Sequence, residues 1–150
     1  MGMYAHLVPV NAASAADLAA RSDEELRTLL RGPDSTNINK SWEAAFPLVG
    51  SIAGTGMFLV EEPVPVGSDL GFGPAMFIDP EQVADIAARL ASADEVTVEE
   101  HWATLESPFM GNGLYEDENG KEFAMDGYAK TVRVFVSAAA ASQGVLFAIM

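Results

Sequence analysis

The 150-residue sequence contains no cysteine. Disulfide bonds, cysteine-ligated zinc, iron–sulfur clusters and thiol nucleophiles are therefore excluded. Long apolar runs are also missing, because no uncharged stretch reaches the ~18 residues that a membrane-spanning helix needs. The N-terminus has no basic segment ahead of an apolar one, so it does not resemble a signal peptide. These absences predict a cytoplasmic protein without a membrane span.

Positive charge is scarce, since 8 Lys and Arg residues face 22 Asp and Glu residues and the formal net charge is −14. Between Ser41 and Gly120, fifteen residues are acidic and one, Arg89, is basic, whereas acids and bases are equal in number outside that stretch. Such a region repels nucleic-acid backbones and anionic membranes. It attracts basic proteins and speeds their association. We therefore expect a basic protein as partner and neither nucleic acid nor membrane, with solubility as the alternative role of the charge.

Hydrophobic residues make up 49% of the chain, which is enough for one packed core. The length is typical of one domain and no linker or repeat interrupts it, so residues 1–150 are predicted to form a single domain. Strands are predicted over 3–10, 74–78 and 145–150. Because helices and strands do not alternate strictly, we expect an α+β fold in which about four to five helices cover a small mixed β-sheet.

Two helix starts are clear in the sequence. Ser22 begins a capping-box pattern, and Asp79 is a good N-cap ahead of Pro80, which suits the first helical position. Further helices are predicted over 39–49, where Pro47 should kink or shorten the helix, from Thr97 onward, and over 123–142. Residues 50–74 are expected to form a long loop with one short element. Residues 116–120 are expected to form a solvated hairpin turn.

Four stretches of the chain match one family pattern, namely residues 1–4, 37–43, 69–83 and 139–150. The third is the most specific and contains Leu-Gly-Phe-Gly-Pro-Ala-Met-Phe-Ile. Through these stretches the chain resembles the YfbM-like family, a bacterial domain of unknown function. The resemblance spans nearly the whole chain. It implies an α+β fold and no established activity, and it supplies no catalytic residue.

The sequence contains few residue patterns that are typical of catalysis, metal binding or phosphate binding. Its two histidines, His6 and His101, show neither the His-x-x-x-His nor the Glu-x-x-His spacing of metal sites. A base–nucleophile pair would need a distant Ser or Thr alongside one of them. The glycine-rich stretch 50–56 lacks the Gly-Lys-Ser/Thr ending of a phosphate loop. No catalytic residue, cofactor or metal site is therefore predicted.

A candidate binding group comes from segments that carry the resemblance. Tyr4 and His6 alternate on the first predicted strand and so share a face, and Lys40 lies at a predicted helix start. Asp69 and Phe72 belong to a glycine-rich segment that we expect to form either a tight turn with Phe72 packed down or a ligand surface. Convergence of these five residues would create a small-molecule pocket near the N-terminal strand.

The favoured function is a non-catalytic interaction module, such as an inhibitor or immunity-type protein that masks a basic active site. Its candidate partner surface consists of Glu99, Glu100, Asp117 and Glu118, which would steer association. One alternative is a small-molecule binding protein or weak hydrolase that uses the candidate binding group. Another is a structural, oligomer-forming protein whose apolar C-terminal end pairs across a two-fold axis.

Overall fold

The computed structural model describes residues 3–56, 59–106 and 115–150. These residues form an α+β fold, as predicted. Its elements are, in order, β1 (Ala5–Val10), η1 (Ala15–Asp17), α1 (Asp23–Arg31), β2 (Thr36–Asn37), η2 (Asn39–Ser41), α2 (Trp42–Ala53), β3 (Val64–Asp69), β4 (Pro74–Ile78), α3 (Pro80–Ser92), α4 (Glu95–Ala103), α5 (Glu118–Ala140) and β5 (Gly144–Ile149). None of the helices within the described ranges is long and apolar enough to cross a membrane.

The sheet has the strand order β2-β1-β5-β4-β3, and every described strand pair is antiparallel. The C-terminal strand β5 lies at the centre, because it pairs with β1 on one side and with β4 on the other. The expected sheet was mixed. The difference arises because β1 and β4 run in the same direction but never become neighbours, since β5 is inserted between them.

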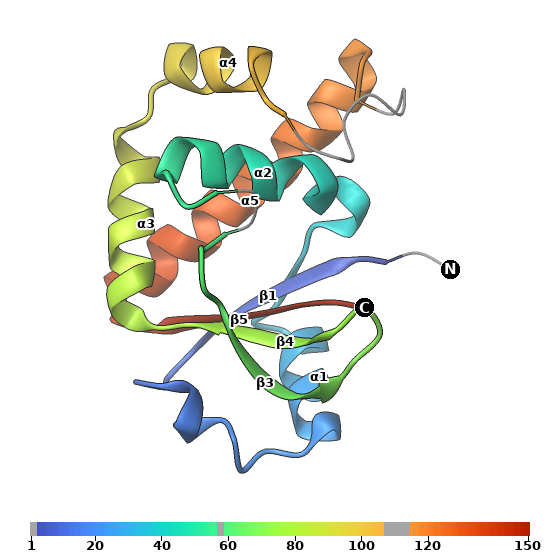
Figure 1. The fold of residues 1–150 in the computed structure, drawn as a ribbon, viewed down its shortest axis with the longest axis vertical. Coiled ribbons are helices and arrows are strands. Elements are labelled where there is room, and N and C mark those ends of the chain that lie inside the picture. Colours follow the sequence, from blue (N-terminus) through green and yellow to red (C-terminus); the bar gives the residue numbers. More distant parts are fainter. Residues whose placement is uncertain (1–2, 57–58, 107–114) are drawn as a thin grey trace.

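Helices cover both faces of the sheet (Figure 1). One face packs against α2, α3 and α5 and contains Leu7, Phe147 and Ile149. The other face packs against α1 and contains Val8, Leu146 and Ala148. All six residues of β5 are buried, which explains why its sequence is an apolar run without alternation. The predicted buried C-terminal strand is therefore confirmed.

Both predicted helix starts form as expected. Ser22 Oγ accepts a hydrogen bond from the Glu25 backbone N–H at 3.2 Å. Asp79 Oδ1 accepts one from the Gln82 N–H at 2.8 Å, and Gln82 Oε1 accepts the Asp79 N–H at 3.3 Å. These side chains satisfy backbone N–H groups that have no partner in the first helical turn.

Three local predictions were wrong, each where tertiary context overrides a local signal. Helix α2 continues through the buried Pro47 to Ala53, so part of the expected loop is helical. Strand β3 was also expected to be loop, because it is an edge strand with Pro65 and Gly67 and mostly exposed residues. The expected hairpin turn at 116–120 is instead the start of α5, where Asp117 Oδ1 accepts the Gly120 N–H at 2.7 Å.

Candidate functional site

Two members of the candidate binding group, His6 and Phe72, lie on opposite faces of the sheet. His6 lies on the face of the sheet that packs against α1, next to Leu30 and Arg31. Phe72 lies on the opposite side, with its ring centroid 6.1 Å from that of Trp42, which belongs to the core under α2. Burial lowers the pKa of His6, and the positive charge of Arg31 lowers it further.

Asp69 shapes the turn that carries Phe72. Its Oδ1 accepts hydrogen bonds from the N–H groups of Gly71 at 2.8 Å and Gly73 at 3.1 Å. Gly73 has a φ of 89°, which favours glycine. The segment is thus a tight turn, and Phe72 is only partly packed down, since its ring contacts Trp42 while 51% of the residue remains exposed. It borders an apolar cavity of ≈ 270 Å³ whose other lining residues include Met76 and no other member of the candidate group.

Tyr4 and the turn that carries Phe72 both bond to the C-terminal end of the chain, since the Phe72 N–H donates to the Ile149 carbonyl at 3.1 Å. The backbone N–H of Tyr4 donates to the carbonyl of Met150 at 2.8 Å, which extends the pairing of β1 with β5. The Lys40 side chain is exposed, while its carbonyl oxygen lies 3.0 Å from the hydroxyl of Tyr115. Among the described residues, the cavity at Phe72 is lined by no other member of this group, and the hollows beside α4 and α5 are lined by none of the five.

The sequence did not predict that one carboxylate is buried. Glu43 is only 7% exposed, although it is one of the fifteen acidic residues between Ser41 and Gly120. Its Oε2 lies 3.2 Å from the hydroxyl of Tyr115, which joins α2 to the segment ahead of α5. Burial raises the pKa of Tyr115 well above its usual value, and the negative charge of Glu43 raises it further. Tyr115 thus stays protonated and serves as a donor.

Two of the four candidate partner residues, Glu99 on α4 and Glu118 on α5, act on the same side chain, Lys121. Glu99 accepts a 2.7 Å hydrogen bond from the ammonium group of Lys121, and this contact raises the pKa of Lys121. The charge of Glu118 acts on the same ammonium group in the same direction. Asp117 caps α5, so it has a structural role as well.

Helix α4 has an unusual outer surface. The helix contributes no buried residue, and its Val96 is 65% exposed. A shallow hollow of ≈ 470 Å³ on this helix is lined by Glu95, Val96, Glu99, Glu100 and Ala103. We call these five residues the acidic face of α4. Figure 1 shows α4 at the end of the molecule opposite α1. The acidic face therefore lies far from both packed faces of the sheet.

A serine and a histidine also meet at this end of the molecule. Ser51 Oγ on α2 lies 2.7 Å from His101 Nδ1 on α4, although fifty residues separate them in the chain. Hydrolases that use such a pair add a group that orients the histidine and a site for the substrate. In residues 3–56, 59–106 and 115–150, no carboxylate bonds to His101. The contact attaches α4 to α2.

In the same ranges, no three His, Asp or Glu side chains are placed to hold a metal ion. The fold and the sites together define an acidic α+β protein with an antiparallel sheet and an exposed acidic helix. A family model described as a domain of unknown function, DUF1877, matches residues 1–148, and the chain belongs to this family. Neither the curated proteins nor the solved structures contain a significant match to the chain.

Proposed function

We infer that the protein is a non-catalytic interaction module that binds a basic surface of another protein through the acidic face of α4. The observation that carries this proposal is that α4 buries none of its nine residues and leaves Val96 65% exposed. A helix this short is marginal in water, and a surface helix normally gains stability by burying apolar residues. The inner side of α4 packs through the half-buried Trp102, whereas Val96 on its outer side has no such contact. A partner protein supplies the surface against which Val96 becomes buried.

The composition of the acidic face suits a basic partner. Val96 and Ala103 are apolar and lie two turns apart, while Glu95 and Glu100 make no ion pair within the described part of the chain. A small apolar centre with a charged rim is the usual anatomy of a protein interface. The rim carboxylates raise the association rate with a Lys- or Arg-rich surface.

An inhibitor or immunity-type protein that masks a basic active site is the concrete form of this proposal. We also propose that the protein is a member of the YfbM-like family, which four stretches of its sequence resemble. That resemblance implies no activity of its own, so the function rests on the geometry of α4.

The test is capture of binding proteins from native lysate at low salt, followed by elution with a salt step. Wild-type protein is compared with Glu100→Lys, which reverses a charge on the acidic face. Its matched control is Glu24→Lys, which makes the same change in net charge at an exposed position on α1. We expect a stoichiometric basic protein that Glu24→Lys retains and Glu100→Lys loses by about tenfold or more.

Affinity for the captured protein is then measured at several ionic strengths. A steep decrease in affinity between low and physiological salt supports the proposal, because rim charges are screened over a Debye length. Equal capture by the two variants, or an affinity that salt does not change, contradicts it.

A further inference from the structure

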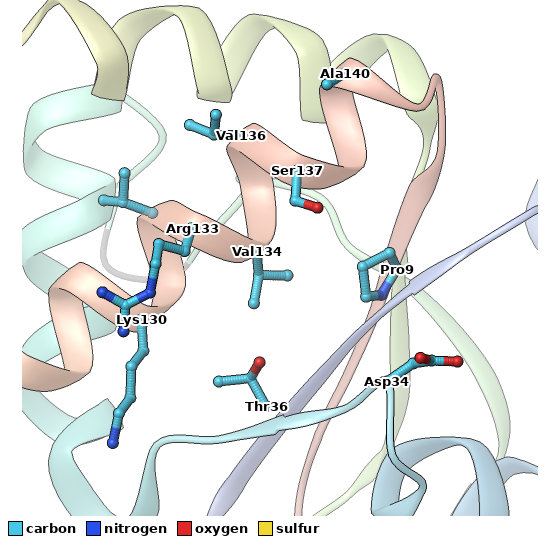
Figure 2. A pocket seen from close by; sticks show the side chains of 10 residues that line it. Pro9, Asp34, Thr36, Lys130, Arg133, Val134, Val136, Ser137 and Ala140 are labelled. Atoms are coloured by element: carbon cyan, nitrogen blue, oxygen red, sulfur yellow. The ribbon is translucent and has the colours of Figure 1, made fainter.

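A second surface of the molecule has the opposite charge character. A groove of ≈ 810 Å³ lies between α5 and the β1–β2 edge of the sheet. Figure 2 shows Lys130 and Arg133 at one end of this groove and Asp34 and Pro9 at the other, with Thr36 between them. Valine and alanine side chains of α5 make up most of the wall between these ends.

The two cations of the groove are not equivalent. Lys130 Nζ lies 2.9 Å from Asp126 Oδ2, so much of its charge is already neutralised. Arg133 is exposed and has no ion pair or hydrogen bond within the described ranges. A guanidinium group binds a carboxylate through two parallel hydrogen bonds. Arg133 is therefore an available carboxylate anchor in a protein whose net charge is −14.

The edge of the sheet limits how a ligand can be held. The β1 residues whose backbone faces β2 include Ala5 and Leu7, whose carbonyls accept bonds from the Ile38 N–H and the Ser35 hydroxyl. By the two-residue period of the ladder, Pro9 is the next residue that faces this side, and proline has no N–H. A chain cannot extend the sheet by a continuous ladder here. Side chains, rather than the sheet edge, must recognise the ligand.

The dimensions of the groove suit a short extended peptide. From residue 130 to residue 140, α5 rises by about 15 Å, which equals the length of about four to five residues of extended chain. The wall between the charged ends includes Val136, which is 42% exposed. Asp34 lies at the end of the groove opposite Arg133, where it repels carboxylates and attracts N–H groups. The two charged ends therefore favour one orientation of a bound peptide.

We propose that the groove between α5 and the β1–β2 edge binds an extended peptide segment of a partner protein, with an acidic side chain on Arg133 and apolar side chains along α5. The proposal is independent of the acidic face of α4, which would bind a surface of the opposite charge. Because the net charge of −14 opposes the approach of an acidic peptide, we expect a modest affinity.

Amide NMR spectroscopy of the full chain tests this proposal directly. The labelled protein is titrated with acetyl-Leu-Leu-Glu-Leu-amide and, as a matched probe, with acetyl-Leu-Leu-Gln-Leu-amide. We expect the acidic peptide to shift amide signals of residues 130–140 and of Thr36. The neutral peptide should bind about tenfold more weakly, because it lacks the charge-assisted hydrogen bonds.

Variants then locate the binding site. Arg133→Gln should weaken binding of the acidic peptide about tenfold, and Val136→Ser should weaken it severalfold. Arg21→Gln removes the same charge from an exposed position just before α1 and should leave the affinity unchanged. The variants' own amide spectra show directly whether each remains folded.

Several results would overturn the proposal. These are the absence of shifts at millimolar peptide, equal binding by Arg133→Gln and Arg21→Gln, and equal shifts with sodium acetate, which would indicate a simple anion site. Groove signals that move when the protein alone is concentrated would show that a second copy occupies the groove.

Discussion

The central strand β5 and the peripheral helix α4 are built in opposite ways. All six residues of β5 are buried, whereas none of the nine residues of α4 is. β5 is placed by apolar packing on two faces. α4 is placed by three polar contacts and one apolar contact. The polar contacts are the Asp94 N-cap, the pair of Ser51 with His101 and the pair of Glu99 with Lys121. The apolar contact is the half-buried Trp102, which packs against a small buried cluster of α2 and α5. Apolar burial therefore holds the centre of the fold, whereas the outer side of α4 is left exposed.

The largest expected effect tests this contrast directly. Leu146 in β5 is fully buried, so Leu146→Ala should lower the free energy of unfolding by about 3 kcal/mol through lost transfer energy and a residual cavity. Val96→Ala in α4 should change it by less than about 0.5 kcal/mol, because the side chain is exposed. Urea denaturation of both variants measures the difference. Similar losses would show that α4 is part of the cooperative core.

A glycine of α5 provides the next largest effect, where this long helix crosses α2. A Cβ added at Gly127 would lie 2.8 Å from Ser41 Cβ and also contact Ser41 Oγ. Gly127→Ala should therefore destabilise the protein by about 2 kcal/mol through overpacking, despite the ~1 kcal/mol helix preference of alanine over glycine.

The Ser41→Gly background identifies the cause of that loss. Without the Ser41 side chain, Gly127→Ala should lower the unfolding free energy by less than about 1 kcal/mol, since the two sites are coupled. The four proteins of this cycle are compared by urea denaturation. An additive cycle would mean that another neighbour opposes the methyl group.

The contrast also explains which features the sequence could predict. β5 and the α3 start were predictable, because an apolar run and the Asp79-Pro80 pattern act locally. Strand β3 was missed, since an edge strand has few buried residues and therefore little periodicity. At Asp117, one pattern suits both a turn and an N-cap, and the packing of α5 decides between them.

The candidate site was less predictable than the fold for a physical reason. The closeness of Glu99 to Glu118 and the meeting of Ser51 with His101 depend on how α2, α4 and α5 pack, and residue spacing does not contain that information. The same holds for the groove at Arg133, whose walls come from α5 and from segments more than ninety residues earlier.

A smaller effect is expected from removing the hydrogen bond that attaches α4 to α2. Ser51→Ala removes the hydrogen bond to His101, so amide exchange in α4 should become severalfold faster while the global unfolding free energy changes by less than about 1 kcal/mol. Ser92→Ala is the control, because the Ser92 hydroxyl bonds to Arg89 within its own helix. Unchanged exchange in α4 would show that the other contacts hold the helix without this bond.

The smallest effect is a pH dependence that belongs to the sheet and not to α4. The pKa of His6 is lowered from its ordinary value of 6.5, first by burial and then by Arg31. The unfolded chain therefore binds a proton at pH values where the folded protein does not, and stability must fall as the pH decreases below 6.5. Above pH 6.5 the contribution of His6 to stability is fully present.

The unfolding free energy, measured between about pH 7 and pH 5.5, should decrease with decreasing pH. The His6→Gln variant should remove this slope, and Arg31→Gln should reduce it. An unchanged slope in His6→Gln would assign it to other groups. Because β1 and β5 unfold with the core, this pH effect should appear in global unfolding.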